Sequence, residues 1–161
     1  MGILIGCFFL FFVPLFLFAE KQELMMESYV LTKTAYLVEH IKSDGYLSKE
    51  MYEQYQKQLT WTGYLYEIQM EHQQPCYYFD ESSNTYQKYY ENNYEEEIVE
   101  ELFHGTGRYE MKRGDFFFLK VTSKTKGIGD KIRAYFLFPT QTTPAIQVEL
   151  GGMIRDDPER L

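Results

Sequence analysis

A chain of 161 residues has room for one domain and a short additional segment, but not for two full domains. Its 24 acidic residues outnumber the 16 basic ones, and the formal net charge of -8 with no basic stripe argues against nucleic acid as a partner. Cys7 and Cys76 lie in different segments, so the polar part has no internal disulfide, whereas pairing of Cys76 between chains stays open.

The first segment, residues 1–19, has no charged side chain. From Gly2 to Ala19 only apolar or small residues occur, and as a helix they would extend about 27 Å, close to the roughly 30 Å of a bilayer core. Pro14 is compatible with such a helix, because membrane helices tolerate proline where the freed carbonyl finds a partner. We therefore expect residues 1–19 to be an uncleaved transmembrane signal anchor in the cell membrane. Residues 20–161 would then form a single domain outside the cytoplasm in a single-pass protein.

Three alternative interpretations of this segment stay open. A cleaved signal peptide would have a basic start, which is missing, and a cut after Ala19 would place bulky Leu17 at position -3. The tetrapeptide Leu4–Cys7 resembles a lipobox, in which Cys7 would be lipidated, although most of the apolar run follows it. The third alternative is a buried core helix. Few charges flank the run, so the sequence indicates the membrane orientation only weakly.

A long amphipathic helix is expected to continue from the apolar run. Leu24, Leu31, Ala35 and Val38 fall in one narrow stripe at helical spacing, and Val30, Leu37 and Ile41 widen it, which predicts a buried face and a helix that ends near Lys42.

A second helix is expected after a turn at Asp44-Gly45. Ser48 is a plausible N-cap, and Met51, Tyr55 and Leu59 recur every four residues after it. The two helices would form a hairpin or a corner.

The middle of the chain changes from alternating to helical patterns. Tyr64–Glu71 alternates apolar and polar side chains, which predicts a half-buried strand closed by Pro75. Residues 80–93 are polar and rich in tyrosine without a period, which indicates an exposed loop. A short helix is expected at 94–103, with three glutamates at its positive end and a stop at Gly105.

The last third alternates between strands and a helix. Residues 112–115 form an expected turn into an apolar strand at 116–122. Residues 127–138 have helical periodicity, and a strand at 146–150 is expected to break at Gly151-Gly152. This order predicts an α+β fold: an N-terminal transmembrane helix continues into a long amphipathic helix, which packs on a small antiparallel sheet with short extra helices.

The sequence predicts no catalytic, cofactor-binding or metal-binding site. His40, His72 and His104 lack the spacing of ligand pairs and are expected at the surface or as caps. Glu95–Glu97 fits a solvated helix face better than an acid/base pair or a calcium site. Arg113–Asp115 matches an integrin-binding tripeptide, but three residues recur by chance often, and we expect a strand-entry turn that uses glycine at positive φ. We expect no enzyme activity and no cofactor.

Four segments together resemble a known family: DGYLSKEMYEQYQKQLTWTGYLYEIQMEH, EEEIVEELF, MKRGDFFFLKVTSKT and IQVELGGMIRD. Their succession is similar to small membrane proteins of Tad/Flp-type pilus systems in Gram-positive bacteria, and the likeness covers most of residues 20–157. A hydrophobic helix followed by a small sheet domain is also the plan of pilins and pseudopilins. The resemblance implies a minor pilin or assembly component and carries over no catalytic residue.

The leading functional expectation is therefore a membrane-anchored, pilin-like structural or assembly component of a surface filament. Its partners would be the membrane and other pilin-like or assembly proteins, in homo- or hetero-oligomers. Aromatic and small side chains would either pack against neighbouring helices or contact lipid. These residues are Gly2, Gly6, Phe8, Phe9, Phe11, Phe12, Pro14, Phe16 and Phe18.

The alternative expectation is an anchored extracellular binding module that recognises a protein or a glycan through the tyrosine-rich loop. Tyrosine suits recognition because it buries a large area at low entropic cost. The candidate surface consists of Tyr77, Tyr78, Tyr86, Tyr89, Tyr90 and Tyr94. A secreted enzyme is a third hypothesis, and it would need a pocket with perturbed titratable groups.

Overall fold

A computed structural model describes residues 2–82, 84–125 and 146–155; the side chains of residues 2–5, 8 and 9 lie outside this description. The described part is an α+β fold with antiparallel sheets, as predicted. Its elements in chain order are α1 (Gly2–Asp44), β1 (Tyr46–Ser48), α2 (Lys49–Thr60), β2 (Tyr66–Asp80), β3 (Thr85–Tyr94), α3 (Glu95–His104), β4 (Arg108–Glu110), β5 (Phe116–Ser123) and β6 (Gln147–Met153).

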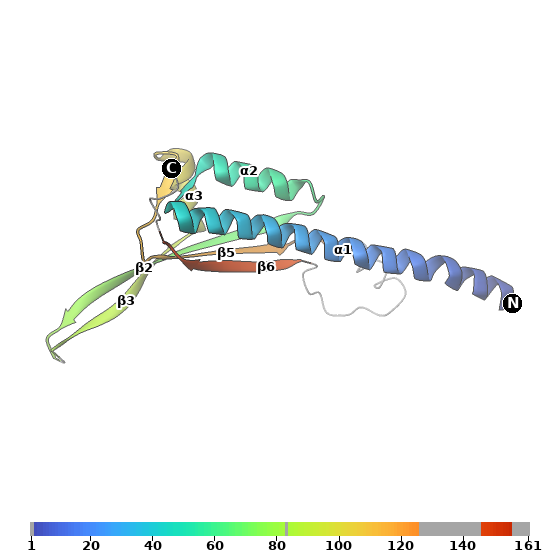
Figure 1. Ribbon diagram of the computed structural model, residues 1–161, viewed down its shortest axis with the longest axis horizontal. Coiled ribbons are helices and arrows are strands. Elements are labelled where there is room, and N and C mark those ends of the chain that lie inside the picture. Colours follow the sequence, from blue (N-terminus) through green and yellow to red (C-terminus); the bar gives the residue numbers. More distant parts are fainter. Residues whose placement is uncertain (1, 83, 126–145, 156–161) are drawn as a thin grey trace.

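Helix α1 is long, and only its C-terminal half lies along the sheet, while its N-terminal half projects from the body (Figure 1). The buried stripe is formed by Val30, Thr34, Leu37, Val38 and Ile41. Leu24 and Leu31 were predicted on this stripe, but both are exposed. The predicted face is confirmed at Val38 and at the three residues expected to widen it, Val30, Leu37 and Ile41. Thr34 is also buried there, and a purely apolar pattern does not indicate it.

The expected membrane anchor is contradicted. Among the described residues, no helix is both long enough and apolar enough to cross a bilayer. The predicted location in the cell membrane, with the C-terminal domain outside the cytoplasm, depended on this anchor and is therefore contradicted as well.

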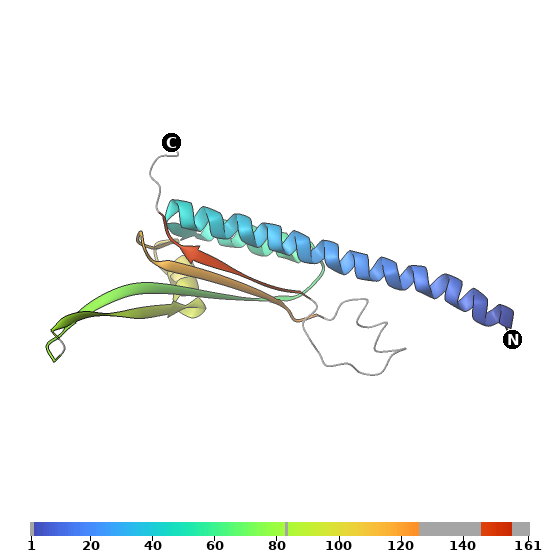
Figure 2. The same cartoon turned by 60° about the horizontal axis from the view of Figure 1, so that its bottom comes forward.

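The main sheet has the strand order β3-β2-β5-β6, and each neighbouring pair is antiparallel. Strand β5 lies in the middle of the body, and its side chains alternate strictly. Phe117, Leu119 and Val121 are fully buried, whereas Phe116 and Phe118 are half-buried. The buried set faces the core under α1, so the other face of the sheet is open (Figure 2).

The core joins this sheet face to all three helices of the described part. Tyr52, Tyr55 and Leu59 bury the inner face of α2, and Ile98 and Leu102 bury that of α3. The Ser48 side chain accepts a hydrogen bond from the Met51 amide at 3.2 Å and begins α2, as predicted. A two-stranded sheet of β1 and β4, which no sequence pattern indicated, closes this end of the body.

Two predictions around the tyrosine-rich segment are wrong. Pro75 does not end the strand: it lies inside β2, opposite Tyr90 of β3. Strand β5 reaches β2 only as far as Gln73. Beyond this point one edge of β2 has no partner strand among the described residues, so a missing N–H is tolerated. The expected loop at 80–93 is mostly strand β3, and β2 and β3 form a long hairpin that leaves the body (Figure 1).

The predicted break at Gly151-Gly152 is also wrong, because β6 continues through both glycines to Met153. A Cβ atom on Gly151 would clash with the ring of Phe118 and the carbonyl of Phe117. Glycine therefore allows β5 and β6 to approach closely at this point. The helix predicted at 127–138 lies outside the described residues.

Candidate functional site

The open face of the main sheet is the strongest candidate site. Strand register places one row of side chains on it, because opposite residues of antiparallel strands share a face. At the hairpin tip Phe79 lies opposite Tyr86 with ring centroids 5.2 Å apart. Further in, Tyr90 meets Phe116 at 6.4 Å. The row, called here the aromatic row, consists of Tyr77, Phe79, Tyr86, Tyr90, Tyr94, Phe116 and Phe118.

The aromatic row is well exposed at the hairpin. Tyr86 is 74% exposed and Tyr77 is 65% exposed, and Tyr90 is also exposed. Lys88 lies on the same face with its Nζ 4.8 Å from the centroid of the Tyr90 ring, a cation–π contact. Hydrogen bonding to Tyr90 raises the pKa of Lys88. A large exposed aromatic surface of this kind is typical of a binding surface.

The structure divides the six predicted tyrosines between two faces. Tyr77, Tyr86, Tyr90 and Tyr94 belong to the aromatic row, whereas Tyr78 and Tyr89 lie on the opposite face of the hairpin, 5.9 Å apart. Sequence reasoning missed the three phenylalanines of the row. Residues 77–79 (YYF) and 86–90 (YQKYY) do not alternate aromatic and polar side chains, so no local pattern in the sequence indicated which rings share a face.

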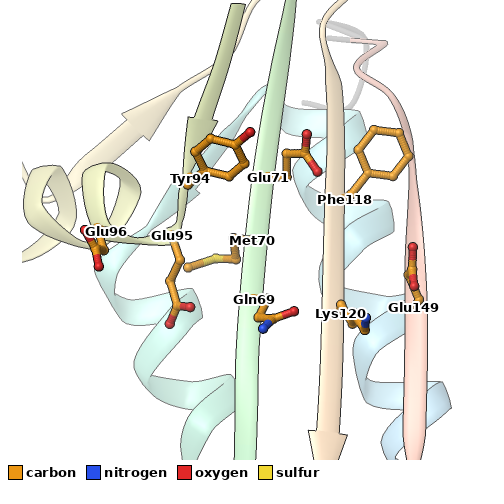
Figure 3. A pocket seen from close by; sticks show the side chains of 9 residues that line it. All are labelled: Gln69, Met70, Glu71, Tyr94, Glu95, Glu96, Phe118, Lys120 and Glu149. Carbon is orange, nitrogen blue, oxygen red and sulfur yellow. The ribbon is translucent and has the colours of Figure 1, made fainter.

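Where the hairpin meets the body, the aromatic row ends in an open groove of about 480 Å³. Figure 3 shows carboxylates on both sides of the groove, Glu95 and Glu96 at the start of α3 and Glu149 on β6, together with Lys120. The groove is lined by Gln69, Met70, Glu71, Tyr94, Glu95, Glu96, Phe118, Lys120 and Glu149.

The charges of this acidic groove are unbalanced, with four carboxylates and one ammonium group. Burial raises the pKa of Glu95, and the neighbouring charges of Glu67 and Glu96 raise it further. Glu71 is held by amide donors, Gln73 Nε2 at 2.9 Å and Asn92 Nδ2 at 3.2 Å. The groove is therefore a place of negative potential beside aromatic rings.

A buried polar cluster lies around His72, which is only 4% exposed although a surface position was predicted. Its Nδ1 lies 2.8 Å from Tyr109 Oη, and its Nε2 lies 2.9 Å from Asp115 Oδ2. Asn93 donates to Tyr109 Oη at 2.8 Å, and the Lys112 amide donates to Asp115 Oδ2 at 2.8 Å.

This cluster is better suited to holding strands together than to catalysis. Burial raises the pKa of Tyr109, which keeps the hydroxyl protonated and able to donate to the imidazole. In the described residues no buried side-chain polar atom lacks a hydrogen-bond partner. Asp115 is 3% exposed, so Arg113–Asp115 is not displayed as an integrin-binding tripeptide; the strand-entry turn is confirmed, with Gly114 at φ 95°.

Metal-binding chemistry finds no support in the part of the chain that the structure describes, where no three His, Cys, Asp or Glu side chains are grouped to hold an ion. Both cysteines have free thiols; Cys7 is exposed and Cys76 is half-buried. The Cys76 Sγ lies 3.9 Å from Glu91 Oε2 on the far face of the hairpin.

The N-terminal half of α1, called here the stem (residues 2–25), contains the other predicted site residues. Phe11 and Phe18 are 75% and 61% exposed, and Gly6 and Pro14 are also exposed. Phe12 and Phe16 are half-buried, and the side chains of Phe8 and Phe9 are not described. Gly2 lies at the first residue of α1. The stem thus exposes one broad apolar side, to which Leu10, Val13, Leu15, Leu17, Leu24 and Met25 also belong.

Comparison with known proteins identifies no relative: no family model, no curated protein and no solved structure matches this chain.

Proposed function

We propose that the protein is a non-catalytic structural or assembly component with a pilin-like plan. In this proposal the stems of neighbouring subunits pack together into a filament or assembly complex, and the sheet-bearing body provides the outer contacts. The observation that carries the proposal is the broad apolar side of the stem, which projects beyond the body (Figures 1 and 2).

The physical argument rests on the free energy of apolar surface. Leu10 is 79% exposed and Phe11 is 75% exposed, next to each other on a helix that leaves the body. Burying one such side chain contributes about 1.5–3 kcal/mol, so several on each of two stems can offset the cost of association. A helix that is apolar around most of its circumference is stable only when it is packed on something.

The shape of the chain supports the same proposal. A helix of 43 residues extends about 65 Å, with its C-terminal half fixed on the sheet by buried side chains such as Val38 and Ile41. The stem is therefore held in a defined direction. Gly6 has open space around its Cα, which would permit the close approach of a second helix backbone.

Sedimentation velocity of the full-length protein tests this proposal. The variant Phe11→Glu/Phe18→Glu places two charges on the exposed side of the stem and should convert assemblies into monomers. Trp61→Glu/Leu65→Glu is the matched control with the same added charge, since Trp61 and Leu65 are 79% and 71% exposed after the end of α2 and outside the stem. A wild-type chain that stays monomeric at every concentration, or assembles equally well with both changes in the stem, would overturn the proposal.

A further inference from the structure

We propose that the open face of the main sheet binds an extended, basic segment of a partner protein. The aromatic row would accept its side chains, and the acidic groove would hold its Lys or Arg cations. This inference does not depend on assembly through the stem, because the two surfaces lie on different elements.

The first step of the argument is that this face is unpartnered within the described chain. The same strands bury Phe117, Leu119 and Val121 under α1, while the residues of alternate position remain accessible on the other side. The aromatic side chains of the hairpin are gathered and exposed on this face, and exposed apolar patches of this kind mark interaction sites.

The second step is charge complementarity, which selects the class of occupant. Glu71, Glu95, Glu96 and Glu149 surround the groove, and Lys120 is the one cation that lines it. Burial, followed by repulsion from the carboxylates of Glu67 and Glu96, already disfavours the ionised form of Glu95. A bound ammonium or guanidinium group would relieve this repulsion, whereas an acidic ligand would increase it.

The third step is the chemistry of the rings. Tyr94 and Phe118 stand in the acidic groove beside the carboxylates (Figure 3). A cation between a carboxylate and an aromatic face gains from both. The chain already makes a cation–π contact of its own on this face, since Lys88 lies over the Tyr90 ring.

The fourth step is length. The aromatic row follows β2 from Glu71, at the acidic groove, to Phe79, at the hairpin tip. These eight steps along a strand correspond to about 26 Å, which an extended segment of about eight residues would cover. A second copy of this chain is disfavoured as occupant because it brings the same net charge of -8. A neutral glycan would use the rings but leave the carboxylates unpaired.

Fluorescence anisotropy with three labelled octapeptides tests the proposal on the full-length protein. The peptides alternate threonine with arginine, glutamine or glutamate. Only the arginine peptide should bind, and raising the salt from about 50 mM to about 500 mM should weaken it. Binding of the glutamate peptide as tightly as the arginine peptide would overturn the proposal.

Matched variants locate the binding. Glu95→Gln/Glu149→Gln should weaken the arginine peptide about tenfold, whereas Glu27→Gln/Glu53→Gln, with the same change in net charge elsewhere, should have less than about a twofold effect. Tyr86→Ser/Tyr90→Ser should lower the affinity for the arginine peptide about fivefold, while Tyr89→Ser on the opposite face should leave it unchanged. Circular dichroism checks that each variant is folded.

Three further outcomes would also overturn the proposal. Equal losses in the groove variant and its charge control would mean that only long-range attraction is measured. Binding of a neutral oligosaccharide such as chitohexaose that depends on Tyr90 but not on Glu149 would identify a glycan surface instead. Concentration-dependent association of the full chain that Tyr86→Ser/Tyr90→Ser abolishes would identify a second copy as the occupant.

Discussion

Thr34 of α1 and Tyr55 of α2 join their side-chain hydroxyls in a buried hydrogen bond of 2.7 Å. The Thr34 hydroxyl also donates to the Val30 carbonyl at 2.7 Å, so its proton is already used and Tyr55 is the donor of the pair. Burial raises the pKa of Tyr55, which keeps this donor protonated. The bond fixes α2 against the half of α1 that lies on the sheet.

The two partners of this bond should contribute unequally to stability. Thr34→Val leaves the buried Tyr55 hydroxyl without an acceptor and should lower the free energy of unfolding by about 1–3 kcal/mol. Tyr55→Phe leaves Thr34 still bonded to Val30 and should cost only about 0.5–1.5 kcal/mol. Urea denaturation measures both. Thr32→Val is the control, because the exposed Thr32 hydroxyl donates to the Ser28 carbonyl at 2.8 Å in the same way. Equal effects of the three changes would contradict this assignment.

Neighbouring phenylalanines of β5 should separate stability from binding. Phe117 is fully buried, so Phe117→Ala should cost about 3–5 kcal/mol in urea denaturation. Phe116 is half-buried on the open face, so Phe116→Ala should lower the free energy of unfolding much less. It should instead lower the affinity for the arginine octapeptide. A similar loss of stability in both variants would mean that the two faces of β5 are equally packed.

The elements of the body were largely predictable from local signals. Ser48, the glutamates before Ile98 and the turn at Gly114 act within a few residues, and the structure confirms α2, α3 and the start of β5 where these signals place them. The α+β class followed from the same one-sided patterns. Boundaries set by caps and turns are therefore readable from one sequence.

The candidate site was not predictable in this form, because it depends on strand pairing between distant residues. Residues 85–94 have no buried face, so no hydrophobic period indicates a strand in the sequence. They form a strand because they pair with β2. The acidic groove combines Glu71 with Glu149, which β2, β5 and β6 bring together only in the folded sheet. The contacts of His72 with Asp115 and Tyr109 could not be predicted for the same reason. A single histidine in a sequence does not indicate which residues it will contact in the fold.

The buried aspartate of this cluster should be more important than an exposed turn residue. Asp115→Ala removes the acceptor of both His72 Nε2 and the Lys112 amide and leaves them unsatisfied, which should cost about 3–5 kcal/mol. Arg113→Ala, at an exposed position of the same turn, should change stability by less than about 0.5 kcal/mol. Thermal and urea denaturation distinguish the two, and a small effect of Asp115→Ala would mean that water readily replaces the carboxylate.

The first turn of α3 offers a pair of glutamates whose substitutions should have opposite signs. Glu97 accepts a hydrogen bond from the Tyr94 amide at 2.8 Å, so Glu97→Gln weakens the helix start and should destabilise the protein by about 0.5–1 kcal/mol.

Glu95 has no such role, and its pKa is raised by burial first and by Glu67 and Glu96 next. A raised pKa means that the folded state favours the protonated carboxyl, so this residue loses stabilising effect as pH rises above the ordinary value of 4.5. Glu95→Gln should therefore be at least as stable as the wild type at pH 7, and the advantage should disappear near pH 4. Urea denaturation across this range measures the difference. If the advantage grew as the pH fell, the carboxylate would be stabilised in the fold, and the acidic groove would have less need of a cation than we infer.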